Sequence, residues 1–171
     1  MKNKGMKWYA VYTGFRKEKS AQRELERAGI EAYVPTVSKV KRYTRKVKKY
    51  QVPLISHYVF VRIEEEQYKR VLSVRDVLRF IGVGRKRSPI PEEEIQILKH
   101  ITGEIEKVEM LPLEALPRGS WVEVMGGALT GLKGKVLSSV GKHRLLVELN
   151  QIGFALSIEV PTKYLRAVNC A

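Results

Sequence analysis

The spacing of apolar positions changes several times along the first hundred residues, which indicates a domain built from both strands and helices. Stretches rich in aromatic and β-branched side chains predict strands over residues 7–13, 30–35, 54–63 and 77–83. Apolar side chains that recur every three or four residues predict helices over residues 15–28, 64–74 and 91 to about 107. Phe15, Ala21 and Leu25 form the expected buried face of the first helix. The order β-α-β-β-α-β-α predicts an α+β domain in which helices flank a mainly antiparallel sheet.

The last third of the chain alternates with a period of two and is interrupted by glycine, which predicts short strands joined by tight turns. These strands are expected over residues 120–125, 134–140, 143–149, 153–160 and 164–168. Gly141 and Lys142 suit a two-residue hairpin loop, and Gly153 suits a bend. Five short strands predict a small five-stranded β-barrel, because closure removes exposed sheet edges. The preceding stretch, residues 109–117, has no clear period and is expected to link two domains at residues 6–108 and 118–169.

The charge of the chain narrows the class of partner. Its 32 Lys and Arg residues against 18 Asp and Glu residues give a net charge of +14. A charge this large opposes compaction unless a polyanion neutralises it, so nucleic acid is the leading candidate and an anionic membrane surface the second. The sequence has neither a basic helix with an apolar face nor an apolar run of membrane-spanning length, so no membrane partner is expected. A basic protein without a polyanionic partner is the remaining alternative.

Most of the excess charge lies in one stretch, because no acidic residue occurs between Glu31 and Glu64. The basic residues expected to bind nucleic acid are Lys39, Lys41, Arg42, Arg45, Lys46, Lys48 and Lys49. Arg62 belongs to the same run, and Tyr43 and Tyr50 are interleaved with it. Such a strip neutralises phosphates, and tyrosines stack on unpaired bases. The alternative is a solvated hairpin whose charge only aids solubility.

The sequence gives little support for a catalytic function. His57, His100 and His143 lie on different elements without metal-ligand spacing, and the single cysteine, Cys170, is next to the C-terminus. The glycine-containing segments 82–87 and 126–133 lack the residues of phosphate-binding loops and are expected to be turns. Acidic residues at 64–66 and 92–94 suit helix N-termini. We therefore expect no enzyme, no metal and no cofactor.

One cysteine and the absence of a signal-peptide pattern favour a soluble protein of the reducing cytoplasm.

Four segments, in order, resemble the NusG family of transcription elongation factors. K-W-Y-A-V-Y-T at Lys7–Thr13, P-L-I-S-H-Y-V-F-V at residues 53–61 and residues 77–91 resemble its N-terminal (NGN) domain. Residues 119–137 resemble its KOW motif, which some ribosomal proteins also carry. The residues that match this motif are Gly119, Val122, Val124, Gly127, Gly131 and Gly134.

The resemblance implies an NGN domain that docks on the clamp helices of the largest RNA polymerase subunit. By position, the docking residues are Tyr9, Tyr12, Ile55, Tyr58 and Phe60, with Ile55 the best candidate for exposure. At least half of Tyr58, Phe60 and the neighbouring valines are expected to be core instead. The basic strip is then placed near the DNA and RNA of the elongation complex. The KOW barrel would recruit a ribosomal protein or Rho through an exposed strand near residues 152–158, and the protein would act as a monomer that suppresses pausing or termination.

Two departures favour a specialised member, such as the RfaH- and UpxY-type antiterminators, over a general factor. Ser56 and His57 stand where the family usually has Pro-Gly, and the chain is unusually basic. The S-P-I-P run at Ser88–Pro91 also favours a specialised member. In RfaH the C-terminal domain can refold as a helical hairpin, but the density of valine and glycine after Gly119 predicts a constitutive barrel here. The alternative function is a ribosome-associated or free RNA-binding protein that uses the KOW barrel and the basic strip directly.

Overall fold

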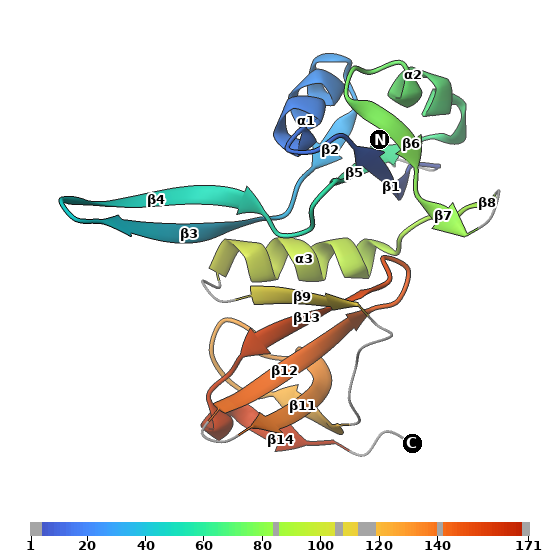
Figure 1. Ribbon diagram of the computed structural model, residues 1–171. Coiled ribbons are helices and arrows are strands. Elements are labelled where there is room, and N and C mark those ends of the chain that lie inside the picture. Colours follow the sequence, from blue (N-terminus) through green and yellow to red (C-terminus); the bar gives the residue numbers. More distant parts are fainter. Residues whose placement is uncertain (1–4, 84–85, 105–107, 113–118, 140–141, 169–171) are drawn as a thin grey trace.

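The structure is a computed structural model that describes residues 5–83, 86–104, 108–112, 119–139 and 142–168. Figure 1 shows two sheets on either side of one long helix, with the N-terminal sheet above it and the C-terminal sheet below. Of the predicted features, the loop residue Gly141, linker residues 113–117 and Cys170 lie outside the described residues.

Four antiparallel strands form the N-terminal sheet: β1 (Lys7–Thr13), β2 (Glu31–Tyr33), β5 (Tyr58–Ile63) and β6 (Val77–Phe80). They lie in the order β2-β5-β1-β6. Two short helices cover one face, α1 (Glu18–Arg27) and α2 (Tyr68–Leu72), the second preceded by a 3-10 turn, η1 (Glu65–Gln67). The third helix, α3 (Glu92–Glu104), covers the other face, where Trp8, Phe60 and Leu98 share one buried cluster. The predicted α+β fold is therefore confirmed.

The first helix begins later than its apolar pattern predicts. Lys17 N–H donates to the Gly14 carbonyl at 3.1 Å, and Arg16 has a positive φ of 57°, so the chain turns before α1 begins at Glu18. Phe15 lies on this turn and is 71% exposed. The expectation that Phe15 contributes to the buried face of a helix is therefore wrong.

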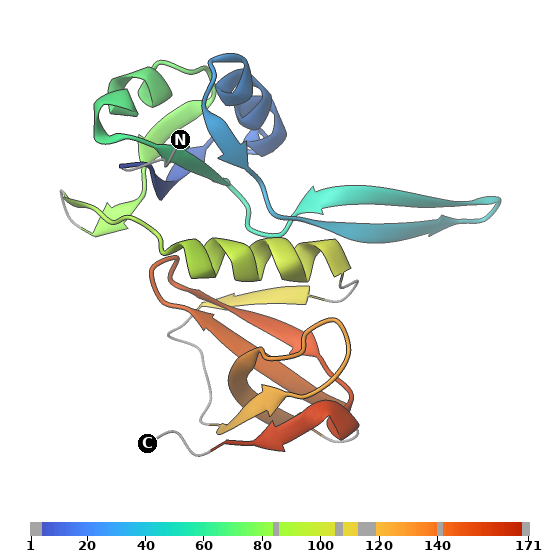
Figure 2. The same ribbon diagram turned by 180° about the vertical axis from the view of Figure 1, so that it is seen from behind.

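A long hairpin projects from the body of the molecule. Strands β3 (Thr36–Tyr43) and β4 (Lys46–Pro53) pair continuously from Thr36 opposite Pro53 to Tyr43 opposite Lys46. Figures 1 and 2 show this hairpin extending away from both sheets. Every residue from Lys39 to Gln51 is exposed. A smaller hairpin, β7 (Gly82–Val83) and β8 (Lys86–Arg87), lies at the other side of the N-terminal sheet.

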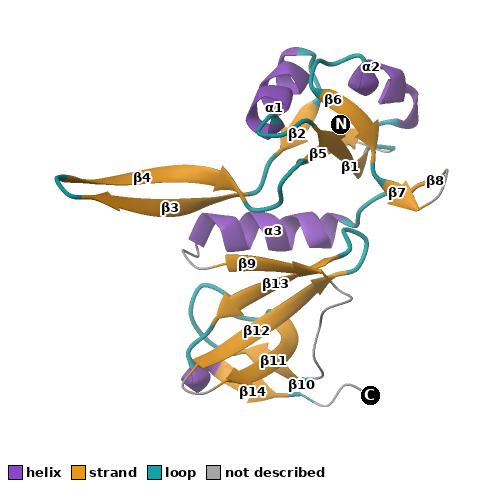
Figure 3. Cartoon of the chain, in the orientation of Figure 1, coloured by secondary structure: helices purple, strands orange, loops and turns teal. Residues whose placement is uncertain are grey.

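Five strands after residue 118 confirm the prediction of an all-β C-terminal part: β10 (Ser120–Val124), β11 (Lys133–Ser139), β12 (Lys142–Leu149), β13 (Phe154–Glu159) and β14 (Leu165–Ala167), with a 3-10 turn, η3 (Thr162–Tyr164). A sixth strand, β9 (Val108–Pro112), comes from the stretch without clear period and pairs antiparallel with β13. The sheet order is β14-β10-β11-β12-β13-β9 (Figure 3).

Helix α3 makes contacts with both sheets. On the N-terminal side, the Tyr33 hydroxyl lies 2.9 Å from Thr102 Oγ1. On the C-terminal side, Gln151 N–H donates to Glu94 Oε1 at 3.2 Å, and the His100 ring is hydrogen-bonded to the Ala128 carbonyl.

The strand near residues 152–158 is largely buried, so the expectation that it is exposed is wrong. Strand β9 covers its edge, and its side chains share the apolar cluster of α3.

The close approach of strands β11 and β12 at Gly134 gives a test of the C-terminal sheet. A Cβ at residue 134 would lie 2.3 Å from the Leu146 carbonyl oxygen, which belongs to the neighbouring backbone. Gly134→Ala is therefore expected to lower the free energy of unfolding by about 1–3 kcal/mol or more, measured by urea denaturation with far-UV circular dichroism. Gly14→Ala is the control, since its Cβ would meet nothing closer than Lys17 Cγ at 3.4 Å. Equal losses in the two variants would contradict the close approach.

Candidate functional site

The five residues that the resemblance assigns to polymerase binding fall into two groups. Tyr9, Ile55 and Phe60 are only 6%, 4% and 0% exposed and belong to the two apolar clusters of the N-terminal sheet. The expectation that Ile55 is exposed is therefore wrong, because this residue packs in the cluster that contains Phe60 instead of standing out from its turn. Tyr12 and Tyr58 are partly exposed and lie directly opposite each other on β1 and β5. The structure thus brings two of the five residues together at a surface.

Tyr12 is the centre of an array of stacked rings and cations. The His57 ring stacks on it with centroids 5.0 Å apart and an interplanar angle of 11°, and the Arg79 guanidinium carbon lies 4.9 Å from its centroid. Tyr58 touches the C-terminal sheet, where its ring meets Phe154 edge-on at 5.7 Å. Burial raises the pKa of the Tyr58 phenol, and the charge of Arg79 partly offsets this effect. Tyr58 therefore stays neutral near pH 7, and both tyrosines present rings that suit an apolar contact.

His57 explains one of the sequence departures. Its φ of 68° lies in the left-handed region, which favours the glycine that the family usually has at this position. Two hydrogen bonds hold this conformation: its N–H donates to Glu18 Oε1 at 2.7 Å, and its carbonyl accepts from Thr13 N–H at 2.8 Å. Glu18 is buried to 5% exposure beside it. A strained backbone that presents an imidazole to Tyr12 is typical of a functional position.

The projecting hairpin has two different faces. Side chains of a β-ribbon alternate between faces, and residues opposite each other in the register share a face. The pairs Lys39–Tyr50, Lys41–Lys48 and Tyr43–Lys46 therefore lie together, and we call this the lysine–tyrosine face. The opposite face carries Val40 beside Lys49 and Arg42 beside Val47. Of the seven predicted nucleic-acid-binding residues, four lie on the lysine–tyrosine face, two on the opposite face, and Arg45 in the turn.

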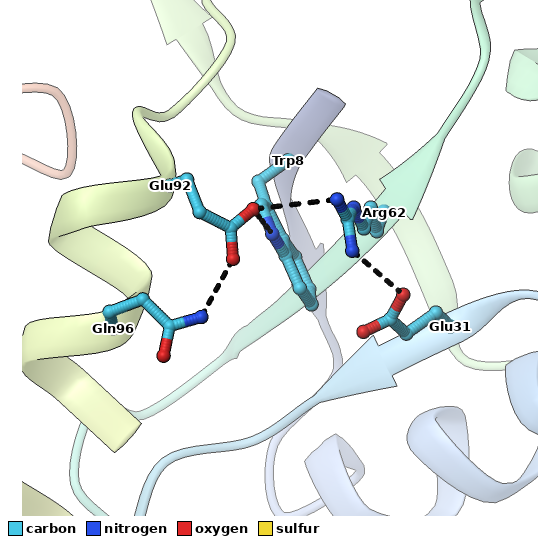
Figure 4. A network of polar contacts seen from close by, with 5 residues as sticks. All are labelled: Trp8, Glu31, Arg62, Glu92 and Gln96. Carbon is cyan, nitrogen blue, oxygen red and sulfur yellow. Dashed lines mark hydrogen bonds and ion pairs between the residues drawn. The ribbon is translucent and has the colours of Figure 1, made fainter. Parts of the chain in front are cut away.

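Arg62, which the sequence groups with the basic strip, lies elsewhere. Its guanidinium is 3.7 Å from both Glu31 and Glu92, and its carbon lies 6.0 Å from the Trp8 ring centroid. The Trp8 Nε1–H donates to Glu92 Oε2 at 2.9 Å, and Gln96 Nε2 donates to the other oxygen at 2.7 Å (Figure 4). This network attaches the first turn of α3 to the sheet, so Arg62 has a structural role.

The same network predicts a pH dependence of stability. The hydrogen bond from Gln96 holds the pKa of the Glu92 carboxyl below its ordinary value, with further help from Trp8, Arg62 and Lys99. A carboxyl whose folded-state pKa is lowered stabilises the protein above its unfolded-state pKa, and this contribution is lost as the pH falls through the folded-state pKa. Since the Glu92 side chain is 43% exposed and solvent screens its interactions, the contribution should be below about 1 kcal/mol.

Glu92→Gln is therefore expected to lose less free energy of unfolding than the wild type when the pH falls from about 5 to about 3. Urea denaturation at a series of pH values measures this difference. Glu93→Gln, an exposed change in the same helical turn, is the matched control and should follow the wild-type curve. Parallel curves for Glu92→Gln and the wild type would show that the network does not hold in solution.

The residues of the KOW motif have structural roles. Val122 and Val124 are buried, and Gly127 and Gly131 have φ values of 79° and 87°. A Cβ at Gly119 would lie 2.6 Å from the Val136 carbonyl oxygen. Residues 125–132 connect β10 to β11, so the predicted turn over residues 126–133 is confirmed except at Lys133, where β11 begins.

Within the described ranges, no group of three or more His, Cys, Asp or Glu side chains is placed to hold a metal ion. No helix in the same ranges is long and apolar enough to cross a bilayer.

Comparisons with known proteins agree with this architecture. The family model described as "Transcription termination factor nusG" matches residues 6–99, more than half of the 171 residues. The solved structure "Domain interaction in Thermotoga maritima NusG" is similar with a TM-score of 0.55 at 19% identity, covering 97% of this chain and 99% of that chain. Conformation A of the MjSpt4:Spt5 complex gives a TM-score of 0.33 at 18% identity, covering 95% of this chain and 98% of that chain. A comparison with curated protein sequences found no match. The match to the family model, together with the likeness of fold, shows that this chain belongs to the NusG family of non-enzymatic transcription factors.

Proposed function

We propose that this protein is an elongation and antitermination factor that binds the clamp helices of RNA polymerase through Tyr12 and Tyr58 and binds nucleic acid of the elongation complex through the hairpin. The observation that carries the proposal is the position of the hairpin: an exposed strip of cations projects from the same domain that presents the Tyr12–Tyr58 surface. One domain can therefore contact a protein and a polyanion at the same time.

The proposed polymerase surface is small and aromatic, as interface anchors usually are. Tyr12, Tyr58 and the His57 ring form its apolar part, and Arg79 supplies a neighbouring cation. Such rigid aromatic anchors tend to carry most of the binding free energy of an interface. Because Phe154 of the C-terminal sheet touches Tyr58, full access to Tyr58 requires the C-terminal sheet to move away from α3. A factor of this kind acts by binding one state of the polymerase clamp more tightly than the other.

The C-terminal sheet would recruit a second partner, a ribosomal protein or Rho. Strand β13 pairs with the edge strand β9, so a partner that adds to β13 must displace β9, which lies directly after α3. Strand addition of this kind satisfies backbone hydrogen bonds and is a common mode of recognition. The two proposed partners are therefore coupled, since both contacts loosen the packing between α3 and the C-terminal sheet. The basic hairpin and the strained His57 agree with a specialised antiterminator.

The test is binding to reconstituted RNA polymerase elongation complexes, combined with measured pause lifetimes. Tyr12→Ala and Tyr58→Ala should each weaken binding by about 5- to 30-fold or more, as expected for loss of an interface anchor. Leu72→Ala is the control, because this side chain is exposed on α2, on the opposite side of the sheet. If wild-type protein neither binds polymerase nor changes pause lifetimes, the proposal fails. Co-sedimentation with ribosomes through the hairpin would then favour the alternative, an RNA-binding protein.

A further inference from the structure

A cavity lies between helix α3 and the connection from β10 to β11, residues 125–132. It has a volume of about 600 Å³. Ile97 and Ile101 of α3 contribute to one wall, and Leu129 and Leu132 of the connection contribute to the other. A cavity of this size falls within the range of small-ligand sites, which are mostly apolar and carry a few polar groups.

The cavity has a buried apolar floor and an open mouth. Ile101 and Leu129 are buried, whereas His100 and Lys133, which also line the cavity, are exposed. Apart from its two chain neighbours, no described residue has an atom within 4 Å of the place that a Cβ at Gly131 would occupy. A ligand can therefore enter from solvent and bury an apolar part against aliphatic side chains, which is favourable.

Lys133 places an unpaired positive charge at the mouth of the cavity. Among the described residues that line the cavity none is acidic, and the Lys133 ammonium group makes no ion pair with another described residue. Glu123 lies opposite Lys133 in the register of β10 and β11, but its carboxylate is 3.3 Å from Arg166 instead. An ammonium group without an anionic partner favours a ligand that supplies one.

We propose that this cavity binds a small amphiphilic anion, a medium-chain carboxylate, whose aliphatic tail packs between α3 and the connection while its carboxylate pairs with Lys133. A neutral amphiphile would bury the same tail without the ion pair. A hydrophilic anion such as phosphate would gain the ion pair without the burial. The selectivity for an amphiphilic anion follows from the apolar walls and the cation together.

Such a ligand would also affect the packing of the C-terminal sheet on α3. It contacts both walls of the cavity at once, so it binds while they are packed together and shifts the protein toward that arrangement. Since full access to Tyr58 requires the C-terminal sheet to move away from α3, the ligand would weaken polymerase binding. This regulatory consequence rests on the proposed function, whereas the binding of the ligand does not.

The test compares decanoate with decanol, which differ in the charge of the head group, by two-dimensional amide NMR titration of the full chain. Decanoate should shift the resonances of Ile97, Gly131 and Leu132 and should bind roughly 2- to 5-fold more tightly than decanol, as expected for an ion pair near the surface. Lys133→Gln should remove this difference and leave the affinity for decanol unchanged. Octanoate should bind more weakly than decanoate by up to about 15-fold, since each buried methylene contributes about fourfold.

Lys163→Gln is the matched control, because it removes an exposed cation of the C-terminal part that does not line the cavity. Lys41→Gln with Lys48→Gln should also retain decanoate binding, which excludes attachment to the hairpin. Ile97→Asp places a carboxylate in the apolar wall and should abolish binding. Far-UV circular dichroism shows whether this variant is folded, and the exposed change Lys133→Gln provides the test if it is not.

Three results would overturn the inference: no shifts at the cavity, equal affinities of the wild type for decanoate and decanol, or loss of decanoate binding only in the hairpin variant. Because binding is measured on the protein alone, a protein that ignores polymerase would leave the site intact and refute only the polymerase contact. Decanoate that binds at the cavity without weakening polymerase binding would support the site and refute only its regulatory consequence.

Discussion

Replacing Lys39, Lys41, Lys46 and Lys48 with glutamine is expected to weaken binding to a DNA duplex by roughly a thousandfold at about 0.15 M salt. These four lysines share the lysine–tyrosine face of the hairpin and are all exposed. Each phosphate that a cation neutralises on duplex DNA contributes about 0.9 to the slope of log affinity against log salt, so four contacts contribute about 3.6. The slope should fall by that amount in a salt titration monitored by fluorescence anisotropy.

A matched control distinguishes the effect of the lysine–tyrosine face on duplex binding from the effect of the net charge. Removing four exposed cations elsewhere, at Arg23, Lys69, Arg70 and Lys163, changes the net charge equally and should leave most of the slope in place. A second comparison contrasts the faces of the hairpin: Lys41→Gln with Lys48→Gln should reduce the slope more than Arg42→Gln with Lys49→Gln. Equal losses in the four-cation variants would mean that net charge, and not this face, drives binding.

The sequence predicts most of the sheet strands because each of them buries side chains in a regular pattern. The hairpin lacks this signal, since its outer part packs on neither sheet and both of its faces are exposed. Strand β9 is not predicted for another reason: its partner residues on β13 lie 42 to 50 residues further along the chain, and Pro112 gives no strand signal by itself. Neither the hairpin strands β3 and β4 nor strand β9 can be predicted from their own local composition.

The candidate site is predicted unevenly for related reasons. A run of one charge sign is visible in the sequence, so the cations of the hairpin are found, but their division into faces depends on the register. The polymerase-binding residues are harder to assign, because helices cover both faces of the N-terminal sheet and alternation along β5 cannot separate surface from core. The spacing of Phe15 fits α1 and therefore predicts a position on the helix face, and only the turn at Arg16 places it outside the helix.

Ile55→Asp is expected to unfold the N-terminal domain instead of acting only on polymerase binding. Ile55 is 4% exposed in the cluster that also contains Phe60 and Val37. Loss of a buried isoleucine lowers the free energy of unfolding by about 2–5 kcal/mol, and the buried carboxylate adds a desolvation penalty of its own. The total approaches the whole stability of a typical domain, about 5–15 kcal/mol. Urea denaturation and one-dimensional NMR measure the loss.

The conservative variant Ile55→Val should lose only about 0.5–1.5 kcal/mol and should bind polymerase like the wild type. Tyr12→Ala should behave in the opposite way, with near wild-type unfolding and weakened polymerase binding, because Tyr12 is partly exposed and stacks on His57 at the surface. If Ile55→Asp unfolds at the same urea concentration as the wild type yet loses polymerase, Ile55 leaves the core in solution and is itself part of the docking surface. The pair of variants therefore decides whether the apolar anchor for polymerase is the turn before β5 or the rings on β1 and β5.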